Sequence, residues 1–386
     1  MTEWIECTLD KLGEIVGGAT PSTKCEDYYG GSIPWITPKD LSSFKGRYIT
    51  SGERNITEKG LASCSAQMMP KDAVLFTSRA PIGYVAIASQ SVCTNQGFKS
   101  IVVNEKADPL FVYYLLKYNK DAIEAMGSGT TFKEVSGKTM RAVKVRIPLD
   151  VSYQKRIAAV LDSLDTKIEN NERINDNLLA QAQTLYKQFF PYGVQDDLPD
   201  GWRIGTVGEI IEIHDSKRIP LSGADRSKME KKIYPYYGAA SLMDLVDNYI
   251  FDGKYLLLGE DGTVVDDAGY PILQYVWGQF WVNNHAHILT GRLGYDVESL
   301  YMLFKQTPVK SIVTGAVQPK ISQANLRSVQ VVSPPEHNLR EYNDLVEPLF
   351  SLFRANEEEC KTFTALRDTL LPKLMSGEID VSAVQL

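Results

Sequence analysis

The sequence predicts an α+β protein with two pseudo-repeated mixed α/β domains, separated by two long helices packed as an antiparallel coiled coil. A heptad pattern without Gly or Pro runs over Gln154–Phe190, and similar spacing recurs over Leu345–Leu374. The segments before the two patterns also match, because Gly129–Pro148 aligns with Gly315–Pro334. The chain has 386 residues, which is too long for one ordinary core and fits a duplicated architecture.

Residues 1–147 are predicted to form the first mixed domain. Short runs of β-branched and aromatic residues, bounded by Gly, Pro or Asn, indicate strands in this part. These runs are Ile33–Ile36, Ala73–Thr77, Tyr84–Ala88, Lys99–Val103 and Val143–Ile147. The apolar residues of Pro109–Asn119 recur at helical spacing, so this segment is predicted to be a helix.

Residues 148–190 are predicted to be the first spacer helix region. The helix would have about 35 residues and a length of roughly 50 Å, and Pro191 would end it. Its heptad seam contains Ile157, Leu161, Leu164, Ile168, Leu178, Leu185 and Phe189. Asn171 and Asn175 occupy the same seam. Asn side chains there either set the register of the helix pair or are simply partly exposed, and the sequence leaves both alternatives open.

Residues 191–333 are predicted to repeat the first domain, and residues 334–386 to form the second spacer helix region. Trp4 has a counterpart in Trp202, and the segment before each long helix is the clearest match. The second seam is predicted to contain Leu349, Leu352, Phe363, Leu366 and Leu370, again with an Asn, Asn356. Pro348 lies near the start of this pattern, so where the second helix begins is left open.

Composition limits the class of protein without naming a function. No apolar run approaches 18 residues and no basic-then-apolar leader begins the chain, so we expect a cytoplasmic protein without a membrane span. The five cysteines form no CxxC pair and are expected to be reduced thiols. The net charge of −7 does not exclude DNA binding, because 18 basic residues face 15 acidic ones within residues 1–147.

Motifs for catalysis are missing from the sequence. It contains no GxxxxGK[ST] loop, no GxGxxG loop and no [ND]PP[FY] tetrapeptide, so we expect no enzyme activity from this chain. His285 and His287 could suggest zinc, but no nearby ligand set completes a site, and no metal is expected. The carboxylates of Glu260 and Asp261 lie in a Gly-rich turn and are interpreted as solvated turn acids rather than as an acid/base pair.

Several motifs together give the chain a family resemblance. They include IPWITPKDL at Ile33–Leu41, TSRAPIGYVAI at Thr77–Ile87, TNQGF at Thr94–Phe98, WVNNHAHIL at Trp281–Leu289 and LRDTLLPKLMSGEI at Leu366–Ile379, besides the first heptad segment. With these motifs the chain resembles the specificity (S) subunit of Type I restriction-modification systems, over essentially its whole length.

The resemblance implies a non-catalytic DNA-recognition subunit. Each mixed domain would be a target recognition domain for one half of a bipartite site, and the helices would dock two methyltransferase (M) subunits. S-adenosylmethionine would bind the methyltransferase partner, and ATP and Mg would bind a nuclease partner where two restriction (R) subunits join. No cofactor is expected on this chain. The alternative is a coiled-coil protein-interaction scaffold without sequence-specific DNA recognition.

Polar residues in loops beside the expected strands are the candidates for DNA binding, because phosphates need cations and base edges need bidentate side chains. In the first domain they are Thr37, Lys39, Lys45, Arg47, Ser78, Arg79, Asn95, Gln96 and Lys133. In the second domain they are Tyr237, Ser241, Lys254, Asn283, Asn284, His285, Gln318 and Lys320.

Overall fold

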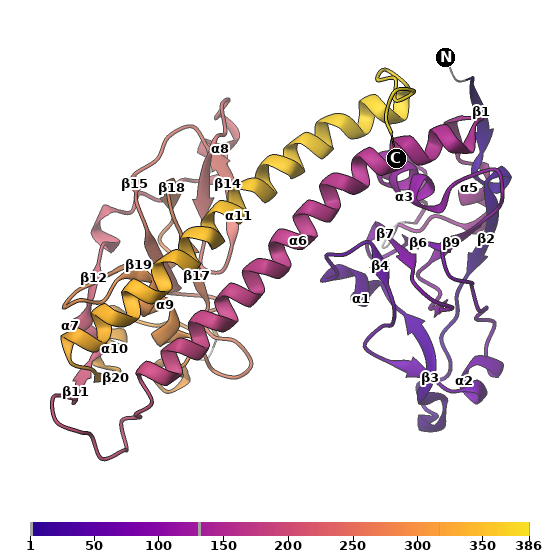
Figure 1. Ribbon diagram of the computed structural model, residues 1–386. Coiled ribbons are helices and arrows are strands. Elements are labelled where there is room, and N and C mark those ends of the chain that lie inside the picture. The colour runs from indigo at the N-terminus through magenta and orange to yellow at the C-terminus, as the bar shows by residue number, and fades with distance from the viewer. Residues whose placement is uncertain (1–2, 130–132, 316, 386) are drawn as a thin grey trace. The chain divides into compact units, whose positions relative to one another are not determined.

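Figure 1 shows the computed structural model, which describes residues 3–129, 133–315 and 317–385. The chain forms two compact units. Unit 1 comprises Met1–Glu172 and Glu357–Leu386, and unit 2 comprises Arg173–Asn356. Each unit therefore contains one mixed domain together with part of each long helix. The predicted boundaries at residues 147, 190 and 333, which separate domains from helices, stay predictions.

The mixed domain of unit 1 consists of two sheets, a two-stranded ribbon and short helices. Its larger sheet has the order β2-β9-β6-β7-β4, its smaller sheet the order β5-β3-β8, and β1 pairs with β10. The strands are β1 (Trp4–Thr8), β2 (Gly13–Gly17), β3 (Tyr29–Ile36), β4 (Tyr48–Ile49), β5 (Asn55–Ile56), β6 (Val74–Ser78), β7 (Ile82–Ala88), β8 (Cys93–Thr94), β9 (Lys99–Val103) and β10 (Lys144–Pro148). The helices are α1 (Pro38–Ser42), α2 (Glu58–Ala62), α3 (Pro109–Tyr118), α4 (Lys120–Ala125) and α5 (Gly137–Ala142), besides short 3-10 turns. The predicted strands and the predicted helix coincide with β3, β6, β7, β9, β10 and α3 to within a few residues.

The core of unit 1 forms where α3 packs against the long helix α6 (Val151–Phe189). Asp108 caps α3 by accepting a hydrogen bond from the backbone of Phe111. Phe111 and Leu115 of α3 are buried, as are Ile157 and Leu161 of α6. Burial of side chains of this size contributes about 1.5–3 kcal/mol each, so this contact is a main reason why α6 is held against the domain.

The mixed domain of unit 2 has the same kinds of layers. One sheet has the order β12-β19-β16-β17, the other the order β14-β13-β18-β15, and β11 pairs with β20. The strands are β11 (Arg203–Thr206), β12 (Ile211–Ile213), β13 (Tyr234–Tyr237), β14 (Leu242–Val246), β15 (Phe251–Asp252), β16 (Tyr255–Gly259), β17 (Leu273–Val276), β18 (Gln279–Val282), β19 (Ala286–Gly291) and β20 (Gln330–Ser333). The helices are α7 (Val207–Ile210), α8 (Gly223–Ser227), α9 (Val297–Phe304) and α10 (Gln323–Ser328).

Equivalent hydrogen bonds confirm the predicted repeat. In each domain a strand near the start of the repeat pairs antiparallel with the strand just before the long helix, as β1 with β10 and as β11 with β20. A Ser caps the short helix that precedes this last strand. Ser136 accepts from the backbone of Thr139 at 3.0 Å, and Ser322 from that of Asn325 at 3.1 Å. The matching flanks in the sequence therefore build matching local structures.

The long helices α6 and α11 (Glu336–Ser376) pack antiparallel within each unit, as predicted. In unit 1 the Arg367 guanidinium lies 2.8 Å from the Asp165 carboxylate. In unit 2 the Tyr342 hydroxyl donates to the carbonyl of Ala182 at 3.2 Å. As the residue number rises along α6 it falls along α11, which is the antiparallel arrangement.

The second helix is longer than its heptad pattern suggests. It begins at Glu336, so Pro348 lies inside it. Pro348 is exposed, and solvent can therefore reach the Asp344 carbonyl that loses its helical donor. No helix in the part of the chain that the structure describes is long and apolar enough to cross a membrane.

The residues of the predicted seam are all at least half-buried on α6 but not on α11. Every predicted α6 residue is buried or half-buried. On α11 the side chains of Leu349, Phe363 and Leu370 are half-buried, but Leu352 and Leu366 are 48% and 44% exposed. The buried apolar residues in the first half of α11 are Leu339, Tyr342, Val346 and Phe350. These residues also pack against the second mixed domain, so the buried stripe of α11 is not a simple coiled-coil seam.

Candidate functional site

In the first domain, three loop segments meet at the end of strand β6. The backbone N–H of Ser78, the last residue of β6, donates to Gly97 at 2.7 Å, and its carbonyl accepts from Val135 at 2.9 Å. The next residue, Arg79, pairs with Glu134 in an antiparallel bridge. Arg79 therefore directly follows a residue that backbone hydrogen bonds hold from both sides. We call Arg79, Glu134 and the turn at residues 95–97 the first strand-end cluster.

The second domain builds the same arrangement at the end of strand β16. The N–H of Glu260 donates to the carbonyl of His285, and its own carbonyl accepts from Ile321, each at 2.8 Å. The next residue, Asp261, pairs with Lys320 in an antiparallel bridge. Asp261, Lys320 and the turn at residues 283–285 form the second strand-end cluster.

An identical turn supplies the third segment in both clusters. The Asn95 side-chain oxygen accepts from the backbone of Gly97, and that of Asn283 accepts from the backbone of His285, each at 2.8 Å. The backbone N–H of Asn95 donates to the carbonyl of Ile36 in β3, and that of Asn283 to the carbonyl of Tyr237 in β13, each at 3.0 Å. In both domains this strand runs parallel to the strand that leads into the Asn turn. Short Asn side chains favour such turns because they replace a backbone acceptor two residues away. Arg79 is thus equivalent to Asp261, and Glu134 to Lys320.

The charged groups of the first cluster are partly exposed. The guanidinium of Arg79 lies 3.4 Å from one oxygen of Glu134, and the Lys99 ammonium lies 3.5 Å from the other. The side chains of Arg79 and Glu134 are 35% and 39% exposed. Exposed pairs of this kind contribute at most about 1 kcal/mol, so a ligand can replace either partner at little cost.

The second cluster rests on a buried network of charges. Arg218 lies 2.6 Å from Glu260 and 3.4 Å from Asp215. The buried His287 ring faces Asp215 at 2.6 Å through Nδ1 and the carbonyl of Ile321 at 2.8 Å through Nε2. Both ring nitrogens of His287 therefore have a polar partner inside the domain.

Burial and pairing act in opposite directions on the carboxylates of this network. Burial raises the pKa of Asp215, but its hydrogen bond from His287 and the charges of His287 and Arg218 hold that pKa below its usual range. Burial also raises the pKa of Glu260, and the hydrogen bond from Arg218 with the charge of His287 lowers it further than burial raises it. Both groups are therefore ionised in the folded protein at neutral pH.

The donor atoms of Asp215, Glu260 and His287 lie close enough together to hold a metal ion. Arg218 already binds both carboxylates and takes the place of a cation between them. Glu260 is only 13% exposed and also lies 3.2 Å from Lys320. It is therefore a paired, largely buried acid and not the solvated turn acid that the sequence indicated.

Several of the predicted DNA-binding residues lie in the two clusters. In the first domain Arg79, Asn95 and the exposed Gln96 belong to the cluster, whereas Ser78 is buried and its hydroxyl donates to Gly97. In the second domain the side chains of Asn283, Asn284, His285 and Lys320 belong to the cluster. Exposed Lys133 and Gln318 lie in the chain segments that lead to Glu134 and Lys320.

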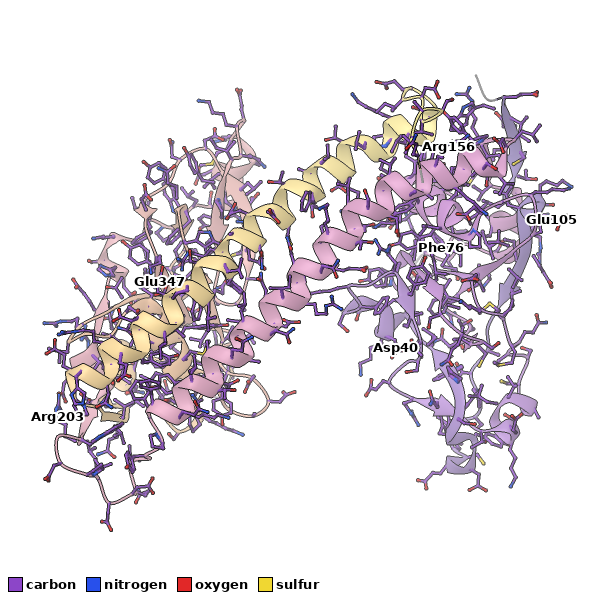
Figure 2. All side chains as sticks on the ribbon, in the orientation of Figure 1. Asp40, Phe76, Glu105, Arg156, Arg203 and Glu347 are labelled. Carbon is purple, nitrogen blue, oxygen red and sulfur yellow. The ribbon has the colours of Figure 1, made fainter. Side chains whose placement is uncertain are left out.

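Thr37 caps the neighbouring helix α1, and Lys39 lies within it. The Thr37 hydroxyl donates to Asp40 at 2.6 Å, and Asp40, labelled in Figure 2, thereby closes the first turn of α1. Lys39 pairs with Glu53 at 2.7 Å and is largely exposed. The residue before Thr37 is Ile36, and its carbonyl accepts a hydrogen bond from the backbone N–H of Asn95. Thr37 therefore lies beside the first cluster.

Two predicted residues of the first domain point to the long helix instead. Arg47 is only 6% exposed, and its guanidinium contacts Asp162 and Glu169 of α6 at 3.4 and 3.1 Å. The exposed Lys45 lies 3.6 Å from Glu172. The buried guanidinium of Arg47 is not displayed to a duplex in this structure, because it connects the domain to α6.

Lys254 has the same kind of structural surroundings in the second domain. Its ammonium lies 2.7 Å from Glu298 of α9 and 3.3 Å from Glu347, which projects from α11 in Figure 2. Tyr237 and Ser241 lie at the turn between β13 and β14, next to the Asn283 turn.

Sequence reasoning missed the network below the second cluster. Asp215 and Arg218 lie in one short segment and Gln323 in another one far along the chain, and no local pattern marks them as partners of His287. The unbroken run Ala286–Leu289 on strand β19 could have shown that His287 is buried, because both faces of the strand are buried there.

Comparison with known proteins places the chain in a family. The model "Type I restriction modification DNA specificity domain" matches residues 1–180 and 199–359. The Type I restriction enzyme MjaIX specificity subunit of Methanocaldococcus jannaschii is 30% identical, with 98% of this chain and 94% of that protein covered.

Two further comparisons agree with this match. The EcoR124I/EcoR124II specificity subunit of Escherichia coli is 28% identical over 48% of this chain and 46% of its own. The crystal structure of a Type I restriction-modification system S subunit from M. genitalium has the same fold, with a TM-score of 0.61, 17% identity and coverage of 97% and 96%. Because the family model matches most of the chain in two copies, this protein belongs to the Type I restriction-modification DNA specificity family.

Proposed function

We propose that this chain is the DNA-recognition subunit of a Type I restriction-modification complex, in which each mixed domain recognises one half of a bipartite target. The observation that carries the proposal is the pair of strand-end clusters. The same backbone hydrogen bonds hold Arg79 and Glu134 in one domain but Asp261 and Lys320 in the other. A common frame with different polar side chains is what two recognition domains for different sequences need.

Catalysis is proposed to belong to partner subunits. Two methyltransferase subunits would bind the chain and carry S-adenosylmethionine, and two restriction subunits with ATP and Mg would join where the system cleaves DNA. This chain would itself bind no cofactor. Its contribution is to place both recognition domains on the duplex and to hold the methyltransferases there.

The test is DNA binding by the complex of this chain with its cognate methyltransferase. Specific duplexes should bind with dissociation constants on the order of 10⁻⁸ M or tighter, and affinity should fall on the order of a thousandfold between 50 and 200 mM salt. Duplexes of random sequence, measured in parallel, should bind far more weakly. Equal affinity for all duplexes at every salt concentration would favour the protein-interaction scaffold instead.

A further inference from the structure

The residue that follows the equivalent hydrogen-bonded residues Ser78 and Glu260 has opposite polarity in the two domains. Arg79 follows β6 and offers only hydrogen-bond donors, whereas Asp261 follows β16 and offers only acceptors when ionised. The facing position is reversed as well, since Glu134 faces Arg79 and Lys320 is the bridge partner of Asp261. The backbone hydrogen bonds are therefore the same in both domains, but the positive and negative side chains have exchanged places.

Both positions combine a rigid backbone with an accessible side chain. Residues 78 and 260 donate and accept backbone hydrogen bonds on both sides, which leaves little freedom to the residues that follow them. The side chain of Arg79 is 35% exposed, whereas that of Asp261 is 18% exposed and that of its partner His285 is 44% exposed. Groups placed to a fraction of an ångström by a rigid scaffold discriminate between ligands better than groups on free loops.

In the first cluster the guanidinium of Arg79 has more N–H donors than its contact with Glu134 uses. Among the described residues, Nη1 of Arg79 is the guanidinium atom with a hydrogen-bond partner, Glu134. The remaining N–H groups form the fork that matches two adjacent acceptors. In the DNA major groove such a pair of acceptors, O6 and N7, belongs to guanine.

In the second cluster an imidazole and a carboxylate act together. Nδ1 of His285 contacts one oxygen of the Asp261 carboxylate and thereby orients that carboxylate. The second oxygen of Asp261 is a hydrogen-bond acceptor. It matches the exocyclic amino group of adenine or cytosine, which donates in the major groove.

We propose that the strand-end residue, Arg79 in the first domain and Asp261 with His285 in the second, is the specificity-determining position of each recognition domain. The first half-site would contain a guanine opposite Arg79, and the second an amino-bearing base opposite Asp261. This inference rests on the proposed function, because it names which base chemistry each domain recognises.

The test uses the full-length chain in complex with its cognate methyltransferase and a plasmid library randomised across both half-sites. Single-molecule sequencing reports how often each sequence is methylated. Arg79→Gln should lower the preference for guanine at one position of one half-site about 10-fold to 100-fold, and leave the other half unchanged. Asp261→Ala should do the same for the amino-bearing base in the other half.

Matched controls remove an equal charge from exposed ion pairs outside the clusters. Lys144 pairs with Glu6 on the β1–β10 ribbon, and Glu336 pairs with Arg340 on α11. Lys144→Gln, the control for Arg79→Gln, and Glu336→Gln, the control for Asp261→Ala, should not change the motif. Preference is a ratio between sequences in one sample, so partial misfolding of a variant lowers every site equally. Arg79→Lys, which keeps the charge but loses the fork, should also relax the guanine position.

An unchanged motif in Arg79→Gln and Asp261→Ala would overturn the inference. So would a uniform loss of methylation at all sequences by a variant whose thermal unfolding matches that of the wild type, because that is the behaviour of a phosphate contact. A wild-type complex that methylates no bipartite motif would overturn the proposed function, and this inference with it.

Discussion

Arg47 shows how one side chain joins a recognition domain to a helix more than a hundred residues away. Its guanidinium contacts Asp162, Asp165 and Glu169 of α6, and the Arg47 side chain is only 7% exposed. The local sequence around Arg47 resembles an ordinary basic loop, and sequence analysis therefore made it a candidate for DNA binding. A partner distant along the chain leaves no local signal, so only the fold could identify it.

Removal of this guanidinium should destabilise unit 1. In Arg47→Met the carboxylates of Asp162 and Glu169 lose their cation, whereas Asp165 keeps Arg367, and the acids repel one another in a half-buried place. Asp162 and Glu169 are about one-third exposed, so the expected cost is about 3 kcal/mol, the low end for a broken buried pair. Denaturant unfolding, followed by hydrogen exchange in α3, measures it.

The control for Arg47 is Lys144→Met, which removes the cation of an exposed ion pair. It should cost at most about 1 kcal/mol. An Arg47→Met variant as stable as this control would contradict the view that Arg47 holds the first domain against α6.

Asp215 should give the second domain a measurable sensitivity to acid. Its folded pKa lies below the ordinary value of 3.8, so its contribution to stability is complete above that value and is lost as pH falls through the folded pKa. Between about pH 4 and pH 2 the wild type should therefore lose stability faster than Asp215→Asn. Urea unfolding of unit 2 at a series of pH values measures the slope.

Glu336→Gln, at an exposed site on α11, is the control for this titration. It should leave the acid slope near that of the wild type. Identical slopes for wild type and Asp215→Asn would show that the buried pairing with His287 and Arg218 stabilises the domain little.

At the scale of elements, periodicity predicted the long helices well and their contacts less well. The first helix was predicted over Gln154–Phe190 and is α6, Val151–Phe189. The second begins before its heptads do, because α11 first packs against its own domain and uses Leu339 and Tyr342 there. A heptad pattern predicts which residues of a helix contact one partner helix. It does not predict the buried residues where the helix also packs against a mixed domain.

The polar layer of the helix pair consists of paired amides. In unit 2 the amide of Asn356 donates to the side-chain oxygen of Asn175 at 2.9 Å, and Asn175 donates to the carbonyl of Phe353 at 3.3 Å. Asn175 and Asn356 are 3% and 7% exposed. The alternative that the sequence left open is thereby resolved for this pair: both side chains are buried and hydrogen-bonded across the helices.

Asn175→Leu should cost about 1–3 kcal/mol, because the amide of Asn356 stays buried without its partner. The double variant Asn175→Leu, Asn356→Leu should recover most of that loss, since an apolar pair suits a coiled-coil seam. A double-mutant cycle of thermal unfolding measures the coupling. Additive losses in the double variant would contradict the pairing.

At the scale of the whole molecule, the duplication could be predicted because it repeats local sequence. The flanks Gly129–Pro148 and Gly315–Pro334 carry the same caps and strands, and the predicted repeat is confirmed. The interiors of the domains diverge in sequence, so the equivalence of Arg79 with Asp261 became visible only through backbone hydrogen bonds.

Independent domains make a clear prediction for a domain exchange. When residues 1–147 are replaced by the corresponding domain of a relative, the complex should change one half of its target and keep the other, because each strand-end cluster is built within a single domain. Methylation mapping of the chimera measures both halves. A chimera in which both halves change would contradict independent recognition.

The most direct test of the central claim is single-molecule sequencing of methylated bases in DNA from cells that express this chain with its cognate methyltransferase. The account predicts one bipartite motif, with two specific halves and a fixed unspecified gap. The absence of any motif, despite a stable complex of the two proteins, would contradict sequence recognition and favour a protein-interaction scaffold.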